Sequence, residues 1–175
     1  MDQMQTKKPI ITTIDDEKDI TDIICTELND QYDVQAFNYA SDIEPVHIET
    51  SDLIIIDFWM PDKTGVQILE DFASLGLSKP VIFVTGFAPE LESQQLPYPY
   101  ACTLEKPIDF QNLKEIIEKI MKIESTIKNA VSQELKKIDK IEDFNFWKIL
   151  RSYESLRYSM YNKMKLIKRS LDKAS

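Results

Sequence analysis

Short apolar runs alternate with stretches of amphipathic spacing along the first two-thirds of the chain. Ile10–Ile14, which is rich in β-branched residues, predicts a strand, and the apolar runs Leu53–Ile56 and Val81–Val84 predict buried strands. Ala101–Leu104 predicts a short strand at the end of the sheet. Tyr32–Phe37 is predicted as a further strand. Because the runs are almost continuously apolar and helical patterns separate them, they predict a parallel sheet that is covered by helices on both faces.

The segments between the strands favour helices. Apolar residues recur at helical spacing from Ile20 to Leu28 and from Gly65 to Phe72, whereas Ser41–Thr50 reads as a short helix or a loop. Leu96–Tyr100 contains two prolines, which a helix interior does not tolerate, so the fourth helix is predicted to be short or irregular. The pattern predicts an α/β fold with a doubly wound five-stranded parallel sheet.

A different pattern begins at Asp109, which is a plausible N-cap, and no glycine follows it. Apolar residues then recur in steps of three and four, close to a 3.5-residue period. They are Ile116, Ile120, Ile123, Ile127, Val131, Leu135, Ile138 and Ile141. A second apolar series runs from Phe146 to Leu171, with Asp143 as a possible new N-cap. The pattern predicts a long α-helical tail, as a helical hairpin, a coiled coil or one interrupted helix.

Charge divides the chain at about the same place. Residues 1–121 hold 8 Lys/Arg and 23 Asp/Glu, whereas residues 122–175 hold 13 Lys/Arg and 7 Asp/Glu. Such an asymmetry is a domain-level signal. We therefore expect one domain over residues 8–121 and a helical extension over residues 122–175, which could serve for dimerisation or output.

Several classes of protein do not fit the composition. No apolar run approaches the ~20 residues that span a bilayer, and Met1–Pro9 lacks the apolar stretch of a signal peptide. Cys25 and Cys102 lack the spacing of a metal site, so we expect two buried, reduced thiols. A cytoplasmic protein is expected.

Polar residues that could carry chemistry follow the predicted strands. Asp15 and Asp16 follow the first strand, Asp57 closes the third, and Thr85 and Lys106 end the fourth and fifth. Ligands bind outside the carboxyl ends of the strands in such a sheet. Clustered carboxylates suit Mg²⁺, and a hydroxyl and an ammonium beside them suit a phosphoryl group.

With these residues in place, the chain resembles the receiver domain of two-component response regulators over about residues 8–121. The resemblance rests on Asp15–Asp16, on LIIIDFWMPDKTG from Leu53 to Gly65, on VIFVTG from Val81 to Gly86 and on LEKP from Leu104 to Pro107. It implies the flavodoxin-like receiver fold and a role in a phosphorelay. It also implies that a sensor histidine kinase or a histidine phosphotransfer protein is the phosphoryl donor.

The resemblance implies a role for each site residue. Asp57 is the phosphoacceptor that forms an aspartyl phosphate, and Thr85 and Lys106 bind the phosphoryl oxygens. Asp15, Asp16, Asp57 and the backbone carbonyl of Trp59 hold Mg²⁺. The receiver would catalyse its own phosphorylation and slow dephosphorylation, and the tail shows no separate enzymatic motif.

Three features of the sequence are not explained by the roles above: the switch position, the bulky residues near Asp57 and the single histidine. Thr103 stands where the family commonly has an aromatic switch residue, and Tyr100 or Phe87 are the candidate substitutes. Trp59 and Phe87 are bulky, and we hypothesise that they shield the aspartyl phosphate from water. His47 is the only histidine, and we expect a surface or packing role, because relay histidines lie on long helices.

Three outputs compete for the tail. A dimerising helical module fits the near-heptad series, because about 50 residues bury little core alone. An adaptor for another protein would use the aromatic residues between Phe144 and Tyr161. DNA binding would use the basic end from Lys163 to Lys173, but the tail lacks the glycine that is frequent in helix-turn-helix turns. We expect signalling through protein association of the tail, as a homodimer, with a transcriptional regulator or a stand-alone phosphate sink as alternatives.

Overall fold

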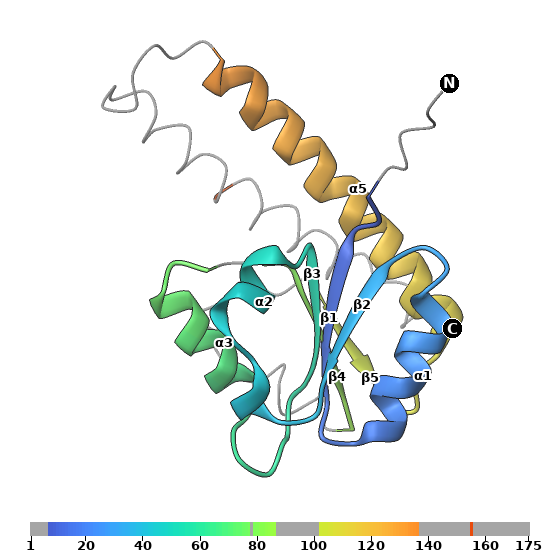
Figure 1. The fold of residues 1–175 in the computed structure, drawn as a ribbon. Helices are drawn as coiled ribbons and strands as arrows, with labels where there is room; N and C mark the ends of the chain where they lie inside the picture. Colours follow the sequence, from blue (N-terminus) through green and yellow to red (C-terminus); the bar gives the residue numbers. More distant parts are fainter. Residues whose placement is uncertain (1–6, 78, 87–101, 137–154, 156–175) are drawn as a thin grey trace. The chain divides into compact units, whose positions relative to one another are not determined.

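The computed structural model describes residues 7–77, 79–86, 102–136 and 155. Five parallel strands form one sheet in the order β2-β1-β3-β4-β5, which is the order of a flavodoxin-like, doubly wound fold (Figure 1). The strands are β1 Ile10–Ile14, β2 Asp33–Phe37, β3 Leu53–Asp57, β4 Val81–Thr85 and β5 Cys102–Glu105. The predicted fold class is therefore confirmed.

β1 has the predicted bounds, whereas an end of each other strand differs from the predicted one by a single residue. Tyr32 was predicted inside β2, but its amide donates to the carbonyl of Leu28 at 3.0 Å, in the turn that ends the preceding helix. At the other end, β3, β4 and β5 each extend one residue further than predicted, to Asp57, Thr85 and Glu105. The three central strands β1, β3 and β4 are buried at every position, as expected of strands that helices cover on both faces.

The helices lie on both faces of the sheet (Figure 1). They are α1 Lys18–Leu28, the 3-10 helix η1 Ala40–Asp42, α2 Pro45–Thr50 and α3 Gly65–Ser74. The weakly patterned segment Ser41–Thr50 thus forms η1 and the short helix α2. Figure 1 shows α1 on one side of the sheet and α2 and α3 on the other.

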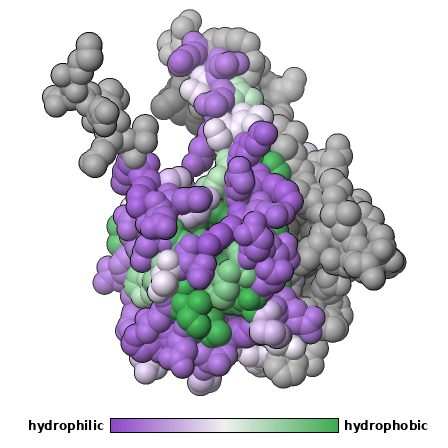
Figure 2. Space-filling model, turned by 90° about the vertical axis from the view of Figure 1, so that its right-hand side faces the viewer, coloured by the Kyte–Doolittle hydropathy of each residue, from purple (hydrophilic) through white to green (hydrophobic). Residues whose placement is uncertain are grey.

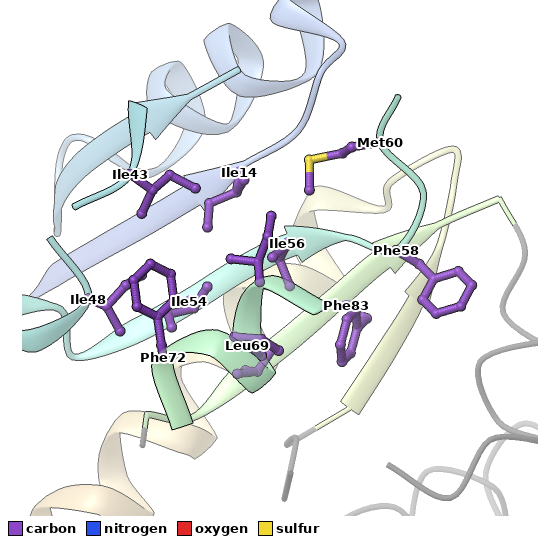
Figure 3. Packing of buried hydrophobic residues seen from close by; sticks show 12 residues of the cluster. Ile14, Ile43, Ile48, Ile54, Ile56, Phe58, Met60, Leu69, Phe72 and Phe83 are labelled. Carbon is purple, nitrogen blue, oxygen red and sulfur yellow. The ribbon is translucent and has the colours of Figure 1, made fainter. Parts of the chain in front are cut away.

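A hydrophobic cluster fills the space between the sheet and the α2–α3 side. Figure 3 shows side chains from β1, β3, β4, α2 and α3 meeting there, among them Ile14, Ile48, Ile56, Phe72 and Phe83. Each of these five residues is less than 9% exposed. Burial of one such side chain contributes about 1.5–3 kcal/mol, so this cluster fixes the strand ends that carry the polar residues.

The last described helix, α5, spans Phe110–Leu135. Asp109 caps it, because its Oδ1 atom accepts from the amides of Gln111 at 3.0 Å and Asn112 at 3.1 Å. The chain divides into two compact units, Met1–Lys114 and Glu115–Ser175, and the division falls inside α5. The predicted fourth helix and the second apolar series from Phe146 to Leu171 lie outside the described residues.

The surface seen in Figure 2 is predominantly hydrophilic, with a smaller hydrophobic area. The large apolar side chains exposed among the described residues belong to separate segments: Ile23, Tyr39, Val46, Trp59 and Leu75. Within the described part of the chain, the helices are too short or too polar to cross a membrane.

Candidate functional site: an acidic pocket at the carboxyl edge of the sheet

The strand register brings the predicted site residues to one edge of the sheet. Ile14 pairs with Ile56, so Asp15 and Asp57 are the next residues on two neighbouring strands. Thr85 pairs with Glu105, so Lys106 follows directly beyond β5 at the same edge. The carboxylates of Asp15 and Asp57 and the ammonium of Lys106 therefore meet because β1, β3 and β5 are parallel strands of one sheet that end at the same edge.

Asp15, Asp16 and Asp57 form a compact carboxylate cluster. One oxygen of each lies within 4.8 Å of the others. Asp15 is 2% exposed and Asp57 is 7% exposed, whereas Asp16 is open to solvent. Burial raises the pKa of Asp15 from 3.8 to about 6, although Lys106 and the amide of Glu17 lower it. The pocket therefore disfavours the negative charge that it holds.

Lys106 is the central cation of the described pocket. Its Nζ atom lies 2.9 Å from Asp15 Oδ2, 2.8 Å from Glu17 Oε1 and 2.9 Å from Asp57 Oδ2. Burial alone would lower the pKa of Lys106, but hydrogen bonds to these carboxylates outweigh burial and raise the pKa above its ordinary value. The side chain therefore stays charged and points a full ammonium at Asp57.

Backbone contacts hold the Asp57 carboxylate from the other side. The amide of Trp59 donates to Asp57 Oδ1 at 3.2 Å, while Oδ2 accepts from Lys106. Gly65, the first residue of α3, holds the start of this helix against β3, because its amide donates to the carbonyl of Phe58 at 3.0 Å. A Cβ atom at Gly65 would lie 2.2 Å from the carbonyl oxygen of Asp57. The loop between β3 and α3 thus packs directly against the backbone of Asp57.

Thr85 and Trp59 lie where the sequence placed them. Thr85 is fully buried as the last residue of β4, and its carbonyl accepts from the amide of Lys106 at 3.0 Å. The side chain of Trp59 is 48% exposed, and its ring meets that of Phe58 edge-on at 5.2 Å. The role of the Trp59 carbonyl as a metal ligand, and that of the Thr85 hydroxyl as a hydrogen-bond donor to the phosphoryl oxygens, stay predictions.

Two residues of the pocket were not predicted from the sequence. Glu17 accepts from Lys106 although it was assigned no role. Asn38 follows β2, and its side-chain amide donates to the carbonyl of Asp15 at 2.7 Å and to Thr21 Oγ1 at 3.0 Å. Asn38 therefore fixes the turn that carries Asp15 and Asp16. Glu17 could have been predicted, because it continues the acidic run Asp15–Asp16–Glu17 after the first strand. Asn38 could not, because an asparagine after an edge strand is common in any loop.

His47, Thr103 and the two cysteines lie outside the carboxylate cluster and make packing or backbone contacts. His47 is half-buried, its Nδ1 atom accepts from the amide of Glu44 at 3.0 Å, and its ring lies 4.7 Å from that of Phe37. Thr103 is buried in β5 beside Phe83. Cys102 is buried, Cys25 is only partly buried, and both are free thiols. The candidate switch residues Phe87 and Tyr100 lie outside the described residues.

The donor set fits a magnesium ion. Two carboxylate oxygens no more than 4.8 Å apart repel each other by at least about 3 kcal/mol at an effective dielectric constant of about 20. One ammonium faces three carboxylates at Lys106, so negative charge remains in excess. Mg²⁺ prefers oxygen ligands and keeps several waters, which suits a cluster of two buried carboxylates and one exposed carboxylate.

The fold and the pocket define a flavodoxin-like α/β domain with a lysine-bearing acidic pocket at its switch point. Residues 11–118 match the family model described as the response regulator receiver domain, and the chain belongs to this family. Among solved structures, it is similar to a CheY-like receiver domain protein of Methanospirillum hungatei, with 25% identity and a TM-score of 0.61. That similarity covers 69% of this chain and 98% of that chain.

Two curated relatives are regulators of larger size. Regulatory protein VanRc of Enterococcus gallinarum is 33% identical over 47% of this chain and 36% of its own length. Transcriptional regulatory protein DltR of Streptococcus agalactiae is 31% identical over 43% of this chain and 35% of its own length. The chain spans only 36% and 35% of these relatives, and 20% of a third relative. The homology therefore concerns a part of each relative, and their whole activity does not carry over.

Proposed function

We propose that the chain is a two-component response regulator that accepts a phosphoryl group on Asp57 in a Mg²⁺-dependent reaction. The observation that carries the proposal is the contact of Lys106 with Asp57 at 2.9 Å inside the carboxylate cluster. The proposed donor is a sensor histidine kinase or a histidine phosphotransfer protein, because receiver domains in general interact with these proteins. The proposed location is the cytoplasm.

The chemistry needs a nucleophile and charge neutralisation. An oxygen of Asp57 forms a bond to phosphorus while the bond from phosphorus to the donor's imidazole nitrogen breaks, and the electron pair leaves with that nitrogen. Lys106 and the Thr85 hydroxyl would bind the phosphoryl oxygens in the product. Asp15, Asp16, Asp57 and the Trp59 carbonyl would hold Mg²⁺, which neutralises charge on the transferred group when it is bound.

The proposal is tested by labelling with a small phosphodonor. We expect acetyl phosphate with Mg²⁺ to add one phosphoryl group to the full chain, detected as a mass increase in intact-protein mass spectrometry. Asp57→Asn removes the nucleophile at nearly constant size and should abolish the label, and chelation of Mg²⁺ should do the same. Asp71→Asn, an exposed carboxylate on α3 with Lys63 as its partner, is the matched control and should label normally. A label that survives in Asp57→Asn would overturn the assignment.

For the output, we propose a change in protein association of the helical tail. The apolar series is present on α5, where Ile116, Ile120 and Ile127 are buried and Ile123 and Val131 are only partly buried. Light scattering with Mg²⁺ and beryllofluoride, a mimic of the phosphoryl group, should show a change in mass relative to the untreated chain. An unchanged mass in both states would remove homodimerisation as the output.

A DNA-binding output is the second candidate, because DltR is named as a transcriptional regulatory protein. The basic end of this chain, from Lys163 to Lys173, would make the phosphate contacts. A mobility shift with nonspecific DNA at low salt would favour this output over protein association, whereas the absence of a shift would favour association or a phosphate sink.

A further inference from the structure

The ammonium group of Lys106 has all its donors engaged. A lysine ammonium carries three N–H donors, and three carboxylates lie within 2.9 Å of Nζ: those of Asp15, Glu17 and Asp57. A phosphoryl oxygen that binds Lys106 must therefore displace or share one of these contacts. The three carboxylates differ in how firmly they are held.

Asp15 and Asp57 are anchored independently of Lys106. The second oxygen of Asp15 accepts from the amide of Glu17 at 3.0 Å, and that of Asp57 accepts from the amide of Trp59 at 3.2 Å. Both side chains are almost fully buried, at 3% and 8% exposure. Moving either one away from Lys106 would leave a buried carboxylate short of a partner, which is costly.

Glu17 is held differently. Its side chain is 62% exposed, and within the described residues Lys106 is the partner found for its carboxylate. When it leaves Lys106, water solvates it at once, so its release has the lowest cost of the three.

The position of Glu17 in α1 strengthens this distinction. Glu17 is the N-cap residue of α1, where a side chain usually accepts a hydrogen bond from an amide of the first turn. The Glu17 side chain makes no such capping bond and reaches Lys106 instead, across 89 positions of sequence. Its contact with Lys106 is therefore a feature of the pocket, not of the helix end.

We propose that Glu17 is a competing carboxylate that occupies Lys106 until a phosphoryl group arrives, and that it thereby slows the capture of phosphoryl groups by Asp57. The inference rests on the proposed phosphorylation of Asp57 and adds a positioning residue to it. Glu17 takes one donor of Lys106 and also places a further negative charge beside an incoming phosphodianion. When phosphorylation releases Glu17, the side chain of the N-cap residue of α1 loses its contact with Lys106. The surroundings of the first turn of α1 therefore differ between the phosphorylated and the unphosphorylated state.

The test compares phosphorylation rates of the full chain at saturating Mg²⁺ over a range of acetyl phosphate concentrations. Glu17→Gln removes the charge at constant size, and we expect the initial rate below saturation to rise about two- to fivefold, the range of an exposed ion pair. The half-saturating concentration of acetyl phosphate should fall, and the gain should shrink at high ionic strength because salt screens an exposed charge. A role in fold stability alone would move neither quantity.

Asp22→Asn serves as the control. It removes one negative charge from the same helix, where the partner is Lys18, and should leave the rate unchanged. Circular dichroism and urea unfolding verify that each variant is folded.

The outcomes separate the two proposals. If the unmodified chain is labelled but Glu17→Gln is no faster, or is slower because it binds Mg²⁺ less tightly, then the inference about Glu17 is wrong while the phosphorylation of Asp57 stands. Equal acceleration by Asp22→Asn would also overturn it, because net charge would then be the cause. If neither the unmodified chain nor Glu17→Gln is labelled, both the proposed function and this inference fail.

Discussion

Gly65 has the tightest surroundings of the three glycines of the chain. Its amide bonds to Phe58, and a Cβ atom there would lie 2.2 Å from the Asp57 carbonyl oxygen and 3.1 Å from the side chain of Ile56. The clashing oxygen belongs to the backbone of a buried central strand, so the helix start would have to move. A side chain at this position therefore disturbs the phosphoacceptor strand itself.

We predict that Gly65→Ala lowers the free energy of unfolding by about 1–3 kcal/mol, the usual cost of overpacking. Urea unfolding followed by circular dichroism would measure the loss. Gly86→Ala is the matched control, because no atom of the described residues lies within 4 Å of a Cβ atom built there, and it should change stability by no more than about 0.5 kcal/mol. Equal midpoints for the two variants would contradict the steric account.

Trp59 is the exposed aromatic residue beside Asp57. Its amide bonds to Asp57 Oδ1, and its ring stands edge-on to the buried ring of Phe58. We predict that Trp59→Asn shortens the lifetime of the aspartyl phosphate, because the smaller polar side chain admits water to the acyl phosphate. The measurement is the decay of the labelled protein after the donor is removed. Leu75→Asn, an exposed apolar residue at the end of α3, should leave the decay unchanged; an unchanged or slower decay in Trp59→Asn would exclude shielding.

The sequence sufficed to find the residues that end strands, but not those that depend on side-chain reach. Asp15, Asp57, Thr85 and Lys106 could be placed because a parallel sheet brings all carboxyl ends to one edge. The contact of Asn38 with the Asp15 carbonyl depends instead on the path of the chain after an edge strand. No periodicity encodes such a path.

At the scale of elements, apolar continuity was the most reliable signal. Strands β1, β3 and β4 were predicted because strands that are buried on both faces carry nearly continuous runs of apolar and β-branched residues. The edge strand β2 was placed with one residue too many at its start, because Tyr32 is apolar enough to extend the run although its amide bonds back to Leu28. Hydrogen bonds in turns decide such ends, and the hydrophobic pattern does not contain them.

The start of α5 depends on one side chain. Asp109 accepts from two amides of the first turn and was predicted as an N-cap because it stands where the helical pattern begins. We predict that Asp109→Ala lowers the free energy of unfolding by about 1 kcal/mol, whereas Asp109→Asn, which can still cap, costs much less. Urea unfolding of the three proteins would measure this difference. Equal losses in both variants would show that the charge of Asp109, not its capping bond, stabilises the helix.

At the scale of the whole molecule, the ionised carboxylate of Asp15 lowers the stability of the folded state. The pKa of Asp15 rises from 3.8 to about 6 on folding, so the folded state binds a proton more tightly than the unfolded state. The resulting destabilisation is absent below about pH 4, grows between about pH 4 and pH 6, and is complete above about pH 6. A cation in the pocket would offset it.

Magnesium should therefore stabilise the chain most where Asp15 is ionised. Since a proton on Asp15 competes with the ion, we predict that the Mg²⁺ affinity falls about tenfold per pH unit below about pH 6. A concentration of about 100 times the dissociation constant at pH 7.5 raises the stability by about 2.7 kcal/mol, and a tenfold loss of affinity reduces this gain to about 1.4 kcal/mol. Thermal unfolding with and without Mg²⁺ at pH 7.5 and pH 5 would measure both gains. Asp15→Asn should be more stable than the unmodified chain without metal at pH 7.5 and should lose most of the response to Mg²⁺. If Mg²⁺ shifted the midpoint equally at both pH values, Asp15 would not be the group that couples the metal to the fold.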